Sequence, residues 1–361
     1  MSSVIPVRTN MPWLEARTIL LVQHGSHAYG TNLPTSDTDY KGVAVPPREY
    51  FLGFSQKFEQ AESKEPDLVI YDIRKFFQLA RDCNPNIIEV LWGERVDDVI
   101  LTPEGRLLVD NRDLFLSKKA RHTFSGYALA QLKRINVHYR WLTNPPKVMP
   151  LRESFGLRPE NEMTPAQRDQ MGAAMAMVIR EVATWHDLEW TELDEPGRIA
   201  LRNRLTDYLA RVGVSQDTLF VNAARSIGLD DNLIDILRRE KDYRAVKQEW
   251  DSYQTWLKTR NPARAEIEAR WGYDTKHASH LVRLLRMCRE ILTTGKVVVK
   301  RPDKDELLAI RNGAWKYGDL VMWAAQQDME MDELYKTSKL QNAPNQKKLD
   351  DLCIQIVARM I

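Results

Sequence analysis

The feature that most constrains the fold is a pair of short apolar runs on either side of a polar stretch near the N-terminus. The runs are TILLV (18–22) and DYKGVAV (39–45), and HGSHAYGTNLPTSDT (24–38) lies between them. Short apolar runs bounded by glycine, proline and small polar residues are typical of buried β-strands. A third run, DLVIYDI (67–73), is rich in β-branched and aromatic residues. The first third of the chain is therefore predicted to contain a sheet.

Beyond about residue 112 the apolar residues recur at helical spacing. Helices are expected at 125–142, 164–190, 197–212, 230–258, 276–293, 318–335 and 346–360. The predicted architecture is a small α/β (α+β) domain over residues 1–112, followed by a larger all-helical domain over residues 113–361.

The cysteines and the apolar runs indicate a soluble, cytoplasmic protein. Cys83, Cys288 and Cys353 are far apart and form no CxxC pair, which argues against a zinc ribbon or a disulfide framework. No run approaches the roughly 20 apolar residues of a membrane span. No membrane partner is expected, and the sequence leaves the oligomeric state open.

Gly25, Ser26, Asp37 and Asp39 suggest a phosphate site beside a metal site. A buried strand that enters Gly25-Ser26 places backbone N–H groups and a hydroxyl at the mouth of a turn, where phosphate oxygens can bind. Asp37 and Asp39 are two residues apart at the start of the next strand, so both carboxylates are expected on one face. Oxygen ligands of this kind favour Mg²⁺ or Mn²⁺. The alternative is a solvated polar turn without a function.

A third acid from a neighbouring strand would complete a two-metal site for phosphoryl transfer. Asp67 stands at the head of the third strand, and alternation places it on the same face as Val69 and Tyr71. Asp72 is the alternative, although it falls on the opposite face. Asp67 is the preferred third acid.

The pattern G-S-(x)n-S-D-x-D resembles the signature of the DNA polymerase β nucleotidyltransferase superfamily. The fuller stretch GSHAYGTNLPTSDTDYKGV is similar to one group within it, the RNA-ligase-associated (RlaP-type) nucleotidyltransferases. Later segments, among them GYDTKHASHLVRLLRMCREILTTG and YKTSKLQNAPNQKKLDDL, also resemble that group. The resemblance spans residues 19 to about 358, with a poorly matched helical insert at about 150–265.

The resemblance implies a polymerase-β-like palm that moves a nucleoside monophosphate from an NTP to a hydroxyl acceptor and releases pyrophosphate. Gly25 and Ser26 would hold the triphosphate, and Asp37 and Asp39 would carry two Mg²⁺ or Mn²⁺ ions. Asp67 would bind the second ion and help to activate the nucleophile. The implied catalytic residues are thus Asp37, Asp39 and Asp67.

The run YDTKHASHLVRLLRM predicts an amphipathic helix on which Lys276, His280 and Arg283 share one polar strip. One interpretation is a solvated basic edge, with His277 buried in the apolar arc. The other places Lys276, His280 and Arg283 across a cleft from the acids, where they bind the nucleotide.

Residues 111–158 carry ten Lys and Arg against two acids, interleaved with aromatic residues. This pattern suits contact with RNA or another nucleic acid, or else a solvated face over a core. If the protein is a nucleotidyltransferase, the sequence leaves three kinds of acceptor open: an RNA 3′ end, a protein side chain or a small molecule. A non-catalytic nucleotide- or nucleic-acid-binding protein on the same fold is the alternative function.

Overall fold

A computed structural model gives the fold and divides the chain into two compact units. The described residues are 5–6, 10–94, 98–186 and 216–361. One unit comprises Met1–Tyr139 and Glu266–Ile361, and the other comprises Arg140–Ala265. The predicted boundary at residue 112 falls inside the first unit and stays a prediction. The expected helix at 197–212 lies outside the described residues.

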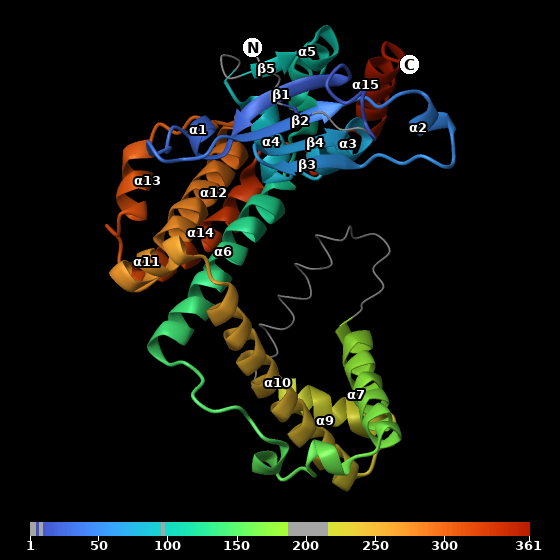
Figure 1. The fold of residues 1–361 in the computed structure, drawn as a ribbon, viewed down its shortest axis with the longest axis vertical. Helices are drawn as coiled ribbons and strands as arrows, with labels where there is room; N and C mark the ends of the chain where they lie inside the picture. The colour runs from blue at the N-terminus through green and yellow to red at the C-terminus, as the bar shows by residue number, and fades with distance from the viewer. Residues whose placement is uncertain (1–4, 7–9, 95–97, 187–215) are drawn as a thin grey trace. The chain divides into compact units, whose positions relative to one another are not determined.

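A five-stranded mixed sheet forms the N-terminal part of the first unit (Figure 1). The strands are β1 (Thr18–His24), β2 (Asp39–Ala44), β3 (Gln60–Lys64), β4 (Asp67–Asp72) and β5 (Asp98–Leu101). Their order is β3-β4-β2-β1-β5, in which β2 and β4 are parallel and the other neighbours are antiparallel. The three strands predicted from the apolar runs are confirmed as β1, β2 and β4.

The two faces of the sheet pack against different parts of the chain. Leu20, Val22 and Val43 belong to the large core, which also contains the buried residues of the helices α3, α4 and α12. Leu21 and Ile70 point to the other face, where a smaller core includes residues of the N-terminal segment before β1. Alternation along each strand therefore decides which side chains meet the helices.

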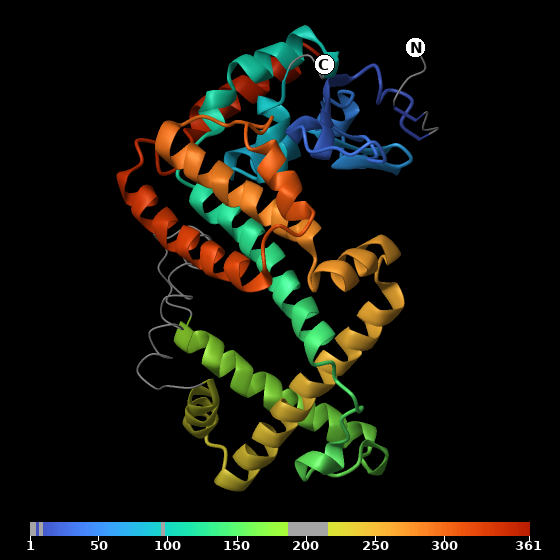
Figure 2. The same cartoon turned by 90° about the vertical axis from the view of Figure 1, so that its left-hand side faces the viewer.

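Helices make up most of the rest of the chain (Figure 2). Those up to residue 143 are α1 (Gly25–Tyr29), α2 (Glu49–Leu52), α3 (Ile73–Arg81), α4 (Pro85–Trp92), α5 (Pro103–Asp110) and α6 (Ala120–Thr143). Those after residue 260 are α11 (Pro262–Trp271), α12 (Thr275–Thr294), α13 (Lys304–Arg311), α14 (Tyr317–Thr337) and α15 (Gln346–Ala358). The predicted succession of a sheet and then a larger helical region is confirmed.

The regular secondary structure described within Arg140–Ala265 is helical. Its main helices are α7 (Pro165–His186), α9 (Gln216–Ser226) and α10 (Asp231–Thr259). They share a core of their own that includes Val178, Ala223 and Leu237. Because this core is separate from that of the first unit, Arg140–Ala265 buries its own apolar surface.

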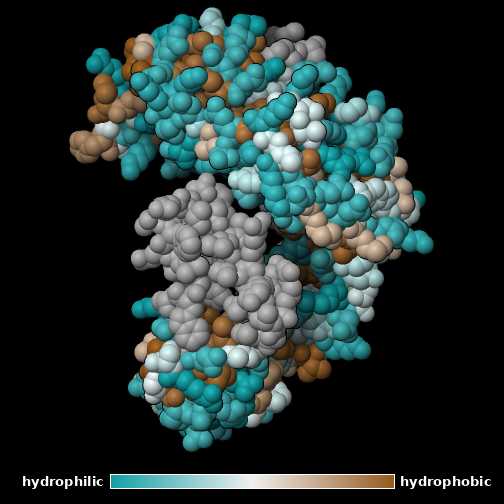
Figure 3. Space-filling model, turned by 180° about the vertical axis from the view of Figure 1, so that it is seen from behind, coloured by the Kyte–Doolittle hydropathy of each residue, from teal (hydrophilic) through white to brown (hydrophobic). Residues whose placement is uncertain are grey.

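One face of the molecule is mostly polar. Figure 3 shows a largely hydrophilic face, on which apolar side chains lie in scattered groups. None of the helices that the structure describes combines the length and apolarity required to cross a bilayer.

Candidate functional site

Gly25 and Ser26 open a short helix directly after β1. The strand runs through His24, and α1 begins at Gly25. Gly25 has a φ of +67°, in the left-handed region that side chains with a β-carbon rarely adopt. A β-carbon at Gly25 would also overlap the Asp39 Oδ2 atom. Gly25 is therefore the residue that allows the β1–α1 backbone to approach the Asp39 carboxylate.

The sheet aligns the candidate acids at one end of two neighbouring strands. Asp39 is opposite His24 on β1 and opposite Asp67 on the parallel strand β4. Asp37 precedes β2 by two residues and is exposed. Paired residues on adjacent strands point to the same face, so the β2–β4 register brings Asp39 and Asp67 together.

The acids affect one another electrostatically. Burial raises the pKa of the Asp39 carboxyl, and the negative charges of Asp67 and Asp37 raise it further. Lys41 and Lys276 act in the opposite direction. Asp39 is thus the centre of a cluster of like charges, and a cation would relieve the repulsion.

Asp72 has a structural task. Its side chain caps α3 by accepting hydrogen bonds from the backbone N–H groups of Arg74 (2.8 Å) and Lys75 (3.3 Å). It also pairs with the Arg74 guanidinium at 3.1 Å and is almost fully buried. Because these contacts occupy both carboxylate oxygens, the arrangement favours Asp67 over Asp72 as the third acid.

A buried ionic network lies behind the strand end and is centred on Glu89 of α4. The Glu89 carboxylate accepts a hydrogen bond from Tyr29 Oη at 2.6 Å and lies 3.2 Å from His24 Nε2. Arg283 of α12 forms an ion pair with the other Glu89 oxygen and lies over the Tyr29 ring, with its Cζ 3.7 Å from the ring centroid. These contacts join β1, α1, α4 and α12.

Burial and pairing set the protonation of this network. Burial acts to raise the pKa of Glu89, but the charge of Arg283 and the contact with His24 outweigh it and hold that pKa well below its ordinary value. Burial lowers the pKa of His24, although Glu89 opposes the effect. Burial and the nearby Arg283 charge lower the pKa of His280 to about 3. At neutral pH the network therefore consists of one carboxylate, one guanidinium and two neutral imidazoles.

The three candidate residues of α12 occupy different environments. Lys276 is exposed in the first turn and acts electrostatically on Asp39. His280 lies 3.3 Å from a guanidinium nitrogen of Arg283 through its Nδ1 atom. Arg283 is only 3% exposed. It therefore does not lie on a solvated strip, because its partner Glu89 is buried in the same interior.

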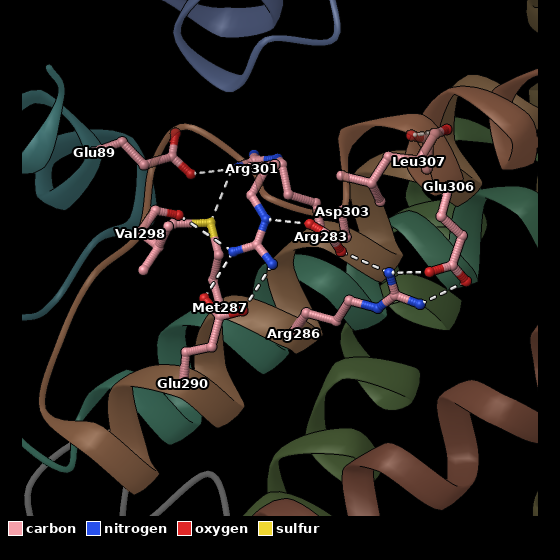
Figure 4. Close-up of polar contacts among 11 residues, drawn as sticks. Glu89, Arg283, Arg286, Met287, Glu290, Val298, Arg301, Asp303, Glu306 and Leu307 are labelled. Carbon is pink, nitrogen blue, oxygen red and sulfur yellow. Dashed lines mark hydrogen bonds and ion pairs between the residues drawn. The ribbon is translucent and has the colours of Figure 1, made fainter.

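A second set of ion pairs attaches the loop after α12 to α12, as Figure 4 shows. Arg301 forms two hydrogen bonds of 2.7 Å with Glu290 and one of 2.8 Å with Asp303. Arg286 pairs with the same Asp303 at 2.6 Å. The backbone N–H of Arg301 also donates to the Tyr29 carbonyl at 3.0 Å. The end of α1 is thus held to the helical core through this loop.

Several cations of the basic segment 111–158 are engaged within the chain. Lys119 pairs with Asp82 at 2.9 Å, and Arg121 pairs with Asp328 at 2.8 Å. Arg152 pairs with a buried glutamate of α10, Glu240, at 2.7 Å. These contacts favour a structural role for the three cations, and nucleic-acid contact by the rest of the segment stays a prediction.

The candidate metal ligands fit a divalent cation in chemical kind. Asp37, Asp39 and Asp67 offer only carboxylate oxygens, the donors that Mg²⁺ and Mn²⁺ prefer. The charge repulsion at Asp39 favours a bound cation at that position. Within the described ranges, no three His, Cys, Asp or Glu side chains are grouped closely enough to form a ready metal site.

Sequence reasoning missed two residues beside the acids, Lys41 and Glu89. Lys41 follows Asp39 by two positions on β2, so alternation alone places it on the same face. Glu89 is the single acid in the apolar run NIIEVLW, and an acid in such a run is seldom buried without a partner. The sequence therefore contained a hint of each residue's position, but it did not indicate which residue each one contacts.

A mixed sheet with Gly-Ser after β1 and aspartates at the heads of β2 and β4 is consistent with a polymerase-β-like domain. Residues 8–143 match the family described as "RlaP: RNA repair pathway DNA polymerase beta family". The resemblance predicted from GSHAYGTNLPTSDTDYKGV is thereby confirmed over the matched segment. The resemblance proposed for segments after residue 143 stays a prediction.

One relative comes from Enterobacteria phage T4 and is described as an uncharacterized 38.9 kDa protein in the nrdC-mobD intergenic region. It is 30% identical to this chain over 133 residues, which cover 34% of this chain and 39% of the phage protein. The match therefore spans about two-fifths of that relative's length. No solved structure matches the chain.

Proposed function

We propose that this protein transfers a nucleoside monophosphate from an NTP to a hydroxyl acceptor, with release of pyrophosphate. The observation that carries the proposal is the position of Asp39. It lies in register with Asp67 on the neighbouring strand, and Gly25 leaves room for its carboxylate. The family match of residues 8–143 supports the same reaction class.

In this reaction the β1–α1 junction would bind the triphosphate. The backbone at Gly25 lies next to Asp39, and Ser26 is the next residue of α1. The backbone N–H groups and the Ser26 hydroxyl would bind the phosphate oxygens. Lys276 is exposed and close enough to act on Asp39, and it would add a positive charge at the same end of the sheet. Arg283 and His280 would act indirectly, because Arg283 pairs with Glu89 behind this junction and His280 contacts Arg283.

Asp37, Asp39 and Asp67 would hold two Mg²⁺ or Mn²⁺ ions. Such ions, when bound, polarise phosphoryl oxygens and make a hydroxyl a better nucleophile. Asp67 is exposed at the head of β4, where it would orient the acceptor hydroxyl or accept its proton. The acceptor we propose is an RNA 3′ end, in keeping with the RNA repair description of the family.

The test is incubation of the purified protein with each α-labelled NTP and Mg²⁺ or Mn²⁺, with and without cellular RNA. We expect label in RNA and pyrophosphate release with the wild type and neither with the Asp37→Asn/Asp39→Asn variant. Label on the protein itself or on a small molecule would support the proposed reaction but would show that the acceptor is not RNA. RNA binding by both proteins without any transfer would contradict the proposal and support a non-catalytic binding protein.

A further inference from the structure

Lys41 is the one lysine of β2, and it lies on the same face as Asp39. The two residues alternate with Tyr40, so both side chains project toward the face covered by α4 and α12. Lys41 is opposite Val22 on β1 and Val69 on β4, two register positions further along the strands than Asp39 and Asp67. Lys41 is therefore on the same face as the acids and close enough for Asp39 and Asp67 to act electrostatically on its ammonium group.

The ammonium group of Lys41 is held by a neutral side chain. Its Nζ donates to Asn86 Oδ1 at 2.8 Å. Asn86 is fixed in turn, because its backbone N–H donates to the Oδ1 atom of Asn84, the residue that caps α4, at 3.1 Å. An ammonium group has three N–H donors, and this contact uses one of them.

Several carboxylates lie near Lys41, yet its hydrogen-bond partner is a neutral amide. Asp39, Asp67 and Glu89 all act electrostatically on its ammonium group. Nevertheless, within the part of the chain that the structure describes, none of these carboxylates forms an ion pair with Lys41. Arg283 provides the contrast, since Glu89 engages its guanidinium directly. A half-buried lysine that served only to balance the acids would be expected to pair with one of them.

We propose that Lys41 is a further substrate-binding residue, whose ammonium group binds a phosphate oxygen of the nucleoside triphosphate while Asn86 keeps it in position. This inference rests on the proposed function, because it places the triphosphate beside Asp39. Phosphate oxygens would satisfy the remaining N–H donors of Lys41 with a charge-assisted contact. The triphosphate would then be bound from two sides. The β1–α1 junction would provide one set of contacts, and Lys41, on the strand that carries Asp39, would provide another.

The experiment separates nucleotide affinity from metal affinity. Binding of the α,β-methylene analogues of ATP, GTP, CTP and UTP is measured by calorimetry with Mg²⁺, and binding of Mn²⁺ alone is measured by electron paramagnetic resonance. Lys41→Met should weaken the tightest analogue roughly 10- to 100-fold, the range of a hydrogen bond to a charged group. Mn²⁺ affinity should not fall, because the change removes a positive charge that repels the ion.

Two control variants and a second test variant accompany Lys41→Met. Lys57→Met removes an exposed lysine before β3 and should bind both probes as the wild type does. Lys41→Arg keeps the charge and should retain most of the nucleotide affinity. Asn86→Asp leaves Lys41 in place but gives it a carboxylate partner, so it should also weaken nucleotide binding. This last variant decides the question if Lys41→Met fails to fold.

Two results would overturn the inference while leaving the proposed function intact. The first is wild-type nucleotide affinity in folded Lys41→Met and in Asn86→Asp. The second is a parallel loss of nucleotide and Mn²⁺ affinity in Lys41→Met, which would show that Lys41 only supports Asp39. A wild-type protein that binds no analogue and transfers no label would instead overturn the proposed function, and the inference with it.

Discussion

Gly25 and Asp39 lie in such close contact that a β-carbon on Gly25 would overlap the Asp39 carboxylate. Gly25 directly follows β1 and Asp39 begins the antiparallel strand β2, where His24 is the register partner of Asp39. The Gly-Ser and Asp-x-Asp parts of the sequence pattern therefore meet at one point. Gly25 therefore has two roles: it adopts the left-handed backbone of the turn, and it leaves space for the Asp39 carboxylate.

Gly25→Ala should abolish transfer and lower stability. The left-handed backbone alone costs about 1–2 kcal/mol in a residue with a β-carbon, and displacement of Asp39 adds to this. Gly30→Ala is the matched control. Gly30 also has a positive φ, of +74°, but its nearest neighbours lie 3.7 and 3.9 Å from an added β-carbon, in ordinary contact. If the two variants lose equal activity, as measured by label transfer, the Gly25–Asp39 contact has no special role.

Asp39→Asn should stabilise the metal-free protein while abolishing transfer. The pKa of Asp39 is raised by burial and by the nearby acids, so the ionised form is disfavoured in the folded state. The stability that this group contributes is present below the ordinary carboxyl pKa and is lost as pH rises through the raised value. Melting temperatures in EDTA should therefore favour the variant at neutral pH, and the difference should shrink on acidification. A variant that melts lower than the wild type at neutral pH would contradict this explanation.

Asp67 and Asp72 should behave in opposite ways when each is replaced by asparagine. Asp67→Asn should fold normally and lose transfer, because the change removes a candidate metal ligand. Asp72→Asn should lower the unfolding free energy by about 1 kcal/mol through its weakened α3 cap, and the folded fraction should keep its specific activity. Chemical denaturation and label transfer on the same samples check both. If Asp67→Asn retained transfer activity and folded Asp72→Asn lost it, Asp72 would be the metal ligand and Asp67 would not.

Glu89→Gln should destabilise the protein by about 3–5 kcal/mol, since it leaves the buried Arg283 charge unpaired. The double change Glu89→Leu/Arg283→Met removes both charges and should recover part of that loss. An unfolding free energy of the double variant below that of Glu89→Gln would show that the pair itself is strongly stabilising.

The same network should make stability depend on pH in the acid range. The pKa of Glu89 is held below its ordinary value, so its contribution is present above that ordinary value and is lost as pH falls toward the folded pKa. Denaturation at a series of acid pH values should show a shallower loss of stability in Glu89→Gln than in the wild type.

Lys276→Ala should weaken NTP binding without lowering stability, because the side chain is exposed and its charge acts at the Asp39 end of the sheet. Calorimetry with a non-hydrolysable NTP checks the affinity. Lys57→Ala, which changes an exposed lysine of the same unit, is the control. Unchanged affinity would leave Lys276 as a solvated residue of an amphipathic helix.

Local pattern was enough to predict the central strands and the main helices. A strand alternates its side chains with period two, so the sequence alone indicated that Asp67 shares a face with Val69 and that Asp72 does not. The helix expected at 276–293 is α12, because its apolar spacing and the glycine that follows it are local signals. The polar strand β3 and the short strand β5 carry too weak a pattern, and they form through pairing with β4 and β1.

The sequence by itself therefore determined the kind of site, because the Gly-Ser and Asp-x-Asp spacing and the strand alternation are properties of neighbouring residues. Only the tertiary structure decided the partners. Arg283 was expected on a polar strip, yet it pairs with Glu89, 194 residues away. A helical period shows which residues share a face but not which buried charge that face will meet. That choice depends on the tertiary fold, which places Arg283 of α12 beside Glu89 of α4 in one core, where two charges removed from water are stable only together.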